Sequence, residues 1–346
     1  MRPIYVNTKI LQYHTTGVQR YLLEMMNQIG SSLTPLQPDQ RREGIRGHLW
    51  EQTVLAARTS RGVLWSPANT GPLLHPRQVV TLHDIAVLEH PEWFGSGFAK
   101  VYQALIPRLA HCARQIIAVS QFTKDRIVLT TNVPEEKVVV IYNAADPRFK
   151  PASPAAIALV AQRLNLPFSH YVLSLGSLEP RKNLQRLLQA WHHIASELPS
   201  DVGLVVAGGL GKSAVFGNLD LPDSTPRVFF TGRVPDEWLP ALYSGALLMV
   251  YPSLYEGFGL PPLEAMSTGT AVITSNQTSL PEVVGDAAWM VNPLDTLEIA
   301  EAIKTLVLNE SERKRLAQAG LKRSKLFSWE QAAKQTWTVL RTVAEE

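Results

Sequence analysis

The 346-residue sequence has a single cysteine, Cys112, and therefore cannot form an intrachain disulfide. This is typical of proteins in a reducing compartment. Long apolar runs are also missing, because the longest, residues 246–251, falls far short of the roughly 20 residues that span a bilayer. Residues 1–7 resemble a short strand and lack the apolar core of a signal peptide. We therefore expect a cytoplasmic protein, and peripheral contact with the inner face of a membrane stays open.

Metal and cofactor motifs are scarce as well. The histidines and the cysteine form no ligand cluster beyond His192-His193, which would point in different directions from a helix. The segment Gly209-Leu-Gly-Lys-Ser-Ala214 fits a loose dinucleotide pattern, but a P-loop would need glycine in place of Val206. Nucleic-acid motifs are absent beyond a mild basicity. We expect no metal, no cofactor and no nucleic-acid partner.

Charge is unevenly distributed along the chain. Residues 1–150 contain 17 Lys and Arg against 11 Asp and Glu, whereas the remainder contains 16 against 19. A basic half could attract an anionic substrate or an anionic lipid surface. A solvated face of mixed charge explains the same numbers, so both interpretations stay open.

Short β-branched runs alternate with amphipathic stretches, which predicts an α/β fold built on parallel sheets. The chain exceeds the size of one hydrophobic core, so we expect two domains divided in the proline-containing segment 146–155. The expected strands are 3–6, 62–66, 78–82, 115–119, 137–141, 171–175, 202–206, 227–230, 247–250, 271–274 and 288–291. The expected helices are 17–29, 47–59, 97–113, 120–130, 183–196, 236–243, 261–268 and 295–308, followed by a helical end with a break at 327–329.

The strongest motif is Tyr255-Glu-Gly-Phe-Gly-Leu-Pro-Pro-Leu-Glu-Ala-Met266, which follows an expected strand. Its glycines allow the backbone to approach a ligand closely, and the helix start after them offers free N–H groups to an anion. Glu256 precedes this loop, and Glu264 is expected in the first helical turn. The two carboxylates would then flank a site the size of a diphosphate. The alternative for Glu264 alone is that it complements the helix dipole.

This motif, with seven residues between its glutamates, resembles the signature of glycosyltransferase family 4, retaining enzymes of the GT-B fold. The similarity continues over nearly the whole chain. It includes Thr16-Gly-Val-Gln-Arg20, Val80-Thr-Leu-His-Asp84, Val119-Ser120, Leu175-Gly-Ser-Leu-Glu-Pro-Arg-Lys-Asn183, Thr231-Gly-Arg-Val-Pro235, Tyr251-Pro-Ser253 and Ser279-Leu-Pro-Glu-Val283. The resemblance implies two doubly wound Rossmann-like domains facing a cleft. Residues 1–150 would bind the acceptor, 151–327 the nucleotide-sugar, and helix 328–346 would pack back on the first domain.

The resemblance also implies roles for individual residues. Glu256 would face the donor sugar, and Glu264 would hold the ribose hydroxyls. Lys182 corresponds to the family's phosphate lysine, and His83, at the end of an expected strand, would contact the donor sugar. The remaining expected donor contacts are the loop residues Gly257, Phe258, Gly259 and Leu260, together with Gly17, Gly176, Ser177, Arg233 and Val234.

Two positions depart from the family pattern. The family usually has Gly-Arg where this chain has Gly176-Ser177, and two glycines where only Gly17 remains. Arg181 either supplies the missing guanidinium or the diphosphate is bound less tightly. A cationic pair, Arg181-Lys182, can neutralise a leaving nucleoside diphosphate. An exposed basic pair near a helix start is the alternative, although cations are unfavourable there.

The expected activity is therefore transfer of a hexose, mannose or a deoxyhexose, to a glycan or lipid-linked acceptor in polysaccharide assembly. Residues 65–94 resemble bacterial mannosyl- and rhamnosyltransferases, which favours a GDP-sugar such as GDP-mannose, with UDP-sugars as the alternative. No Asp-x-Asp motif occurs, so we expect metal-independent transfer. A sugar-nucleotide epimerase, a phosphorylase and a non-catalytic sugar-nucleotide-binding protein are the competing interpretations.

Overall fold

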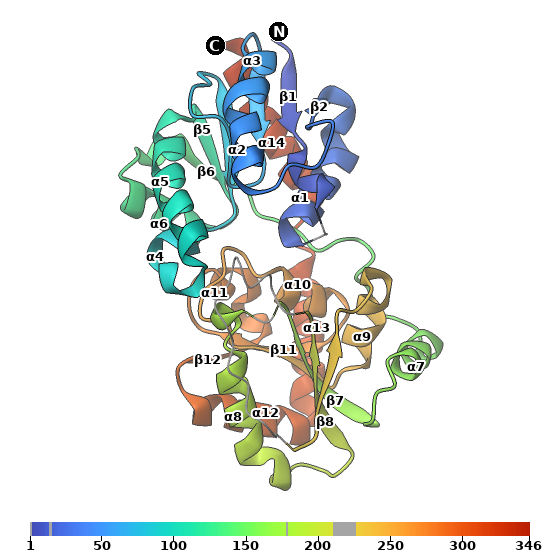
Figure 1. Cartoon of the computed structure of the whole chain (residues 1–346). Helices are drawn as coiled ribbons and strands as arrows, with labels where there is room; N and C mark the ends of the chain where they lie inside the picture. Colours follow the sequence, from blue (N-terminus) through green and yellow to red (C-terminus); the bar gives the residue numbers. More distant parts are fainter. Residues whose placement is uncertain (1, 14–15, 178, 210–225) are drawn as a thin grey trace. The chain divides into compact units, whose positions relative to one another are not determined.

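A computed structural model describes residues 2–13, 16–177, 179–209 and 226–346 (Figure 1). The chain divides into two compact units. The first comprises the residues up to Pro91, Ser96–Ala144 and Ser328–Glu346, and the second comprises Glu92–Gly95 and Ala145–Phe327. The first unit is therefore discontinuous in sequence, because the end of the chain returns to it.

The first unit is built on a six-stranded sheet with the order β2-β1-β3-β4-β5-β6, in which every pairing is parallel. The strands β3 and β4 are buried at every position, as expected for a parallel sheet covered on both faces. The strands are β1 Ile4–Asn7, β2 Thr34–Leu36, β3 Val63–Ser66, β4 Gln78–Leu82, β5 Gln115–Ala118 and β6 Val138–Val140.

Helices cover this sheet, and the last of them comes from the end of the chain. The α14 helix packs against α1 and strands β3, β4 and β5, and it buries Trp329 and Leu340. Ser120 caps α6 by accepting a hydrogen bond from the Thr123 amide at 2.9 Å. The helices are α1 Gly17–Ile29, α2 Gly44–Trp50, α3 Ala56–Thr59, α4 Ala86–Glu89, α5 Ser96–Cys112, α6 Gln121–Thr131 and α14 Trp329–Glu345, with a π-helical turn, Glu51–Leu55, between α2 and α3.

The second unit repeats this architecture with the strand order β12-β11-β10-β7-β8-β9. Alternate residues of β8 enter different cores: Leu204 packs with Trp191 and Ile303, and Val205 packs with Tyr243. The strands are β7 His170–Leu175, β8 Val202–Ala207, β9 Val228–Gly232, β10 Leu248–Tyr251, β11 Ala271–Ser275 and β12 Trp289–Val291. The helices are α7 Pro154–Arg163, α8 Leu184–Ile194, α9 Leu239–Gly245, α10 Leu260–Ser267, α11 Leu280–Val284, α12 Thr296–Leu308 and α13 Glu310–Ser324.

All eleven expected strands are present with ends that differ by at most two residues, but four elements were not expected from the sequence. One of them is the five-residue helix α11, which begins at Leu280. Strand β2 is only three residues long and contains Pro35. Helix α4 has a single turn. Helix α7 begins at Pro154, inside the segment interpreted as a boundary, because proline suits the first helical turn and Ser153 caps it. The two sheets are Rossmann-like, so the α/β prediction is confirmed.

Each sheet has one point where the strand order reverses. In the first unit β1 lies between β2 and β3, and in the second β7 lies between β8 and β10. The carboxyl ends of the strands at such a point open a crevice that usually binds the ligand of an open α/β sheet. The ligand-binding sites of the two units are therefore expected at these two reversal points.

Candidate active site

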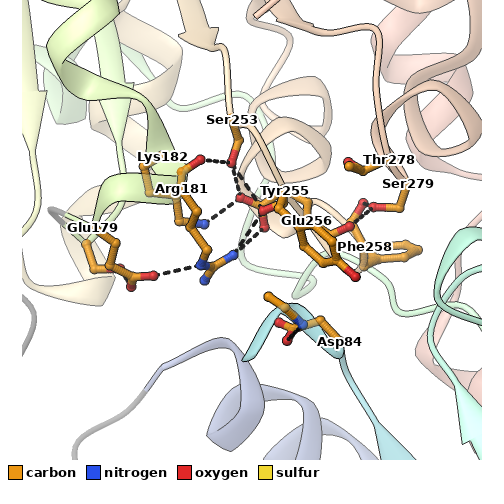
Figure 2. Close-up of polar contacts among 12 residues, drawn as sticks. Asp84, Glu179, Arg181, Lys182, Ser253, Tyr255, Glu256, Phe258, Thr278 and Ser279 are labelled. Carbon is orange, nitrogen blue, oxygen red and sulfur yellow. Dashed lines mark hydrogen bonds and ion pairs between the residues drawn. The ribbon is translucent and has the colours of Figure 1, made fainter. Parts of the chain in front are cut away.

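Two loops meet at the reversal point of the second unit (Figure 2). One follows β7 and contains the short 3-10 helix Pro180–Lys182, and the other follows β10 and leads to Glu256. The Leu254 amide donates to the Arg181 carbonyl at 2.8 Å and ties the loops together. This is how Arg181, Lys182 and Glu256, far apart in sequence, come into contact.

Four charged side chains form one network there, two enclosed carboxylates and two partly buried cations. Lys182 Nζ lies 2.6 Å from Glu256 Oε1, and Arg181 Nη1 lies 3.3 Å from Glu256 Oε2. Arg181 Nε also donates to Glu179 Oε2 at 2.7 Å. Both carboxylates are nearly enclosed, with 4% of Glu179 and 6% of Glu256 exposed. Two cations therefore balance two anions, and Arg181 bridges the two carboxylates.

Neutral groups complete the network around Glu256. Tyr251 Oη and Ser253 Oγ donate to Glu256 Oε1 at 2.8 and 2.7 Å. Lys182 Nζ also donates to Tyr251 Oη at 2.6 Å. Tyr251, Ser253 and Glu179 were not expected in the site, because a tyrosine at a strand end is indistinguishable from a core residue until the strand order is known. Glu256 is thus held by several donors in one orientation.

This environment keeps Glu256 ionised. Burial raises the pKa of Glu256, but Lys182 and Arg181 outweigh burial and lower that pKa to about 2. Burial and the neighbouring Arg181 lower the pKa of Lys182, and Glu256 opposes that shift. Burial and the Glu256 carboxylate raise the pKa of Tyr251 well above its ordinary value, so its hydroxyl stays protonated. Glu256 can therefore accept hydrogen bonds and cannot act as an acid near neutral pH.

The low pKa of Glu256 predicts a specific acid sensitivity. Because the pKa is lower in the folded protein than the ordinary 4.5, ionised Glu256 stabilises the fold above pH 4.5, and this contribution is lost as the pH falls toward 2. We expect the free energy of unfolding to fall more steeply between about pH 5 and pH 3 in the wild type than in Glu256→Gln. Urea denaturation across this range measures it. The exposed-carboxylate variant Glu301→Gln should follow the wild-type curve, and parallel curves for all three proteins would contradict the assignment.

The loop between Glu256 and α10 is shaped by one glycine and one serine. Gly259 has φ +108°, and a Cβ there would lie 2.7 Å from the Leu280 side chain. Ser279 Oγ donates to the Glu256 and Phe258 carbonyls, both at 2.9 Å. With these carbonyls held by Ser279, the backbone is fixed as α10 begins at Leu260.

Glu264 does not lie in the first turn of α10, where it was expected. Helix α10 begins at Leu260, so Glu264 is the fifth helical residue and lies beyond the first turn. Its side chain is 2% exposed and accepts a hydrogen bond from Tyr243 Oη at 3.0 Å. A role in complementing the helix dipole, which acts within the first turn, is therefore wrong.

The other expected site residues of the second unit follow β7 and β9. Gly176 and Ser177 line a small pocket together with Lys182 and Tyr251. The Ser177 hydroxyl hydrogen-bonds the Glu179 carboxylate, so this position orders an acidic side chain where the family has a guanidinium. The remaining pair follows β9, where Arg233 is exposed and Val234 is buried.

His83 and Gly17 belong to the first unit. His83 Nε2 lies 2.8 Å from the Pro67 carbonyl, which can only accept, so Nε2 carries the proton and Nδ1 is left as an acceptor. The His83 amide donates to Asn69 Oδ1 at 2.7 Å. Burial lowers the pKa of His83, so its imidazole is neutral near pH 7. Gly17 is exposed at the start of α1.

Within the described ranges, no group of three or more His, Cys, Asp or Glu side chains could hold a metal ion. Of the helices in the part of the chain that the structure covers, none has the length and apolar character to cross a bilayer. Residues 210–214 of the glycine-containing segment lie outside the described residues.

Comparison with known proteins agrees with this geometry. A model for Glycosyl transferases group 1 matches residues 163–323, and a model for Glycosyltransferase Family 4 matches residues 52–149. The Escherichia coli O-antigen chain mannosyltransferase B is 37% identical over 262 residues, which cover 75% of this chain and 69% of the relative. The chain therefore belongs to the glycosyltransferase family that these two models and this relative represent, and it has the GT-B fold.

Three further proteins are similar to this chain, two in sequence and one in structure. The Salmonella typhimurium O-antigen chain mannosyltransferase RfbU is 32% identical over 73% of this chain and 67% of its own length. The Escherichia coli serotype-specific mannosyltransferase WbdA is 33% identical over 74% of this chain, but the match spans only 32% of that longer protein. Among solved structures, Anabaena Alr3699/HepE in complex with UDP-glucose superposes with a TM-score of 0.78 at 20% identity, covering 99% of this chain and 100% of that one.

Proposed function

We propose that this glycosyltransferase moves mannose, or a related hexose, from a GDP-sugar to a glycan or lipid-linked acceptor in surface-polysaccharide assembly. The observation that carries the donor site is the Lys182–Glu256 contact of 2.6 Å at the reversal point of the second sheet. The similarity to O-antigen mannosyltransferases supports the choice of sugar. These relatives are transferases, and they give no support to the epimerase alternative.

We propose that Lys182 changes partner when the donor binds. Its ammonium group donates hydrogen bonds to Glu256 and Tyr251. The diphosphate of a nucleotide-sugar would compete for it, because its two neighbouring phosphates carry one negative charge each and offer more acceptor oxygens than one carboxylate. Glu256 would keep its bonds from Tyr251 and Ser253 and remain oriented toward the sugar hydroxyls.

The proposed reaction proceeds on one face of the sugar. The bond between the anomeric carbon and the diphosphate oxygen breaks, that oxygen takes the proton of the acceptor hydroxyl, and the hydroxyl oxygen bonds to the same face of the carbon. Lys182 and the amides of Gly257 through Leu260 would stabilise the leaving diphosphate. Glu264 would hold the ribose hydroxyls, and His83 keeps the donor-sugar contact that the family resemblance implies.

A donor panel tests this proposal. We expect thermal stabilisation by GDP and GDP-mannose that exceeds stabilisation by UDP, ADP or dTDP, because a ligand that binds only the folded state raises its stability. We also expect mannosyl transfer with retained configuration that survives excess chelator. Preferential stabilisation by UDP would replace the proposed donor. Activity lost with chelator and restored by magnesium or manganese would contradict metal independence.

We further propose peripheral contact with anionic lipid through the start of α2. Ile45 and Leu49 lie one helical turn apart with 71% and 57% of their surface exposed. Arg41, Arg42 and Arg46 beside them are also exposed. An apolar pair surrounded by arginines suits a membrane surface of negative charge.

Vesicle flotation tests the membrane contact. The protein should float with vesicles containing phosphatidylglycerol at low salt and dissociate as salt is raised, because exposed charges are screened over about 8 Å at physiological ionic strength. Ile45→Ser with Leu49→Ser should abolish flotation, whereas Leu308→Ser, an equally exposed leucine of the second unit, should not. No flotation of the wild type at low salt would show that the basic segment is only a solvated surface.

A further inference from the structure

A second buried charge network lies at the reversal point of the first unit. Asn7 ends β1, Thr70 follows β3, and Glu51 begins the π-helical turn after α2. Strands β1 and β3 are the neighbours at which the order of this sheet reverses. The reversal point therefore brings one acidic and several polar side chains together at the carboxyl edge of the sheet, where such sheets bind ligands.

Glu51 is the centre of this network, and its side chain has no exposed surface. Its Oε1 atom accepts hydrogen bonds from Asn7 Nδ2 and Thr70 Oγ1, each at 2.9 Å. Lys9 Nζ lies 2.9 Å from the same atom, and His48 Nδ1 lies 3.4 Å from Glu51 Oε2. We call Asn7, Lys9, His48, Glu51 and Thr70 the Glu51 cluster.

The Glu51 cluster has the same arrangement of residue types as the proposed donor site. In each sheet a lysine follows the first strand of the unit, Lys9 after β1 and Lys182 after β7. Each lysine pairs with a buried glutamate, and neutral side chains donate further hydrogen bonds to that glutamate. A lysine–glutamate pair with neutral hydrogen-bond donors is thus present at both points where the strand order reverses.

Fold stability alone does not account for the Glu51 cluster. A buried ion pair is often no more stabilising than apolar side chains of similar volume. In addition, Glu51 Oε2 and His48 Nδ1 are buried and face each other at 3.4 Å, and neither has a well-formed hydrogen bond to any other described residue. Unfilled polar capacity at a ligand-binding edge, next to a π-helical turn, is typical of a functional site.

From this geometry we infer that the Glu51 cluster binds hydroxyl groups of the acceptor sugar, an inference that rests on the proposed function. Hydroxyls fit better than phosphate because Glu51 already balances the charge of Lys9, and a hydroxyl can accept from the ammonium group while donating to an acceptor atom. Lys9 and His48, with 10% and 21% of their side chains exposed, are the groups that contact the sugar. Glu51 is a positioning residue that holds both of them.

Saturation-transfer NMR tests this with the full chain, GDP present, and methyl α-mannoside and an α-linked mannobiose as probes. The wild type should bind a probe, and His48→Asn and Glu51→Gln should each weaken its affinity by about tenfold or more while the affinity for GDP stays within about twofold. His75→Gln is the matched control, because His75 is a buried histidine of the same unit bonded to the Thr59 carbonyl, outside the Glu51 cluster. It should leave probe affinity unchanged.

Every result of this experiment either supports or overturns the inference. Equal probe affinity in the wild type and in both cluster variants overturns it, and so does the absence of any probe signal in the wild type. If Glu51→Gln does not fold, His48→Asn decides alone, because it leaves the buried Glu51–Lys9 ion pair in place. Failure of the proposed function is a separate result, since it would appear as no sugar transfer from any donor in the panel and no binding of GDP.

Discussion

Replacing Lys182 with methionine should lower the turnover number for sugar transfer by about 100- to 1,000-fold, the usual effect of removing one group that stabilises developing charge. The ammonium group of Lys182 is buried beside Glu256 and Tyr251, so no solvent-exposed lysine can replace it. Steady-state kinetics with saturating donor measure the effect. The affinity for the nucleoside diphosphate should fall as well, because the charge also serves the ground state.

A surface lysine provides the control for this substitution. Lys304 pairs with Glu197 on the outside of the second unit, and Lys304→Met should leave the turnover number unchanged. Circular dichroism and urea denaturation establish whether the Lys182→Met protein is folded, because its buried Glu256 carboxylate keeps Arg181 but loses its shorter ion pair. A folded Lys182→Met protein with turnover within threefold of the wild type would remove Lys182 from the site.

Gly208→Ala should prevent stable folding of the second unit, with a loss of more than about 4 kcal/mol in the free energy of unfolding. Gly208 has φ +143°, and a Cβ there would lie 1.8 Å from the Gly176 carbonyl oxygen. Both partners belong to the backbone, so no side chain can rotate to relieve the overlap. Because Gly176 lines the pocket beside Lys182, a partly folded protein should also lose nucleotide binding.

The next residue supplies a matched control. Among the residues that the structure describes, a Cβ on Gly209 would meet only Arg233 Cβ at 3.9 Å, an ordinary contact, and Gly209 does not have a positive φ that disfavours other residues. Gly209→Ala should therefore unfold within about 0.5 kcal/mol of the wild type. Thermal unfolding followed by circular dichroism measures both variants. A Gly208→Ala protein with the wild-type melting temperature would show that the two strand ends are further apart than the structure places them.

Local patterns were sufficient to predict eleven of the twelve strands that the structure describes, together with the residues of the main motif. Alternation and caps depend on neighbours in sequence, as at Ser120, which caps α6 as expected. Strand order depends on contacts between distant segments. The placement of Tyr251 and Ser253 against Lys182 follows from β10 pairing with β7, which no local pattern indicates.

Buried charges were the least predictable feature. Glu51 falls within an expected helix, where a glutamate is normally solvated, and the structure encloses it completely. Its partners Lys9 and Thr70 are distant in sequence, and only the completed sheet brings them close. Glu264 shows the same difficulty on a smaller scale. Its buried bond to Tyr243 depends on how α9 packs, and the motif around Glu264 contains no signal for it.

The discontinuity of the first unit determines the order in which the chain can fold during synthesis. Most multidomain proteins fold from the amino terminus as they leave the ribosome. Here the helix that covers β3, β4 and β5 is translated only after the whole second unit. The second unit can therefore fold while the first still exposes the apolar face that Trp329 and Leu340 will cover. During synthesis the first unit therefore stays incompletely folded after the second unit can already fold. Chaperones would act on this incompletely folded first unit.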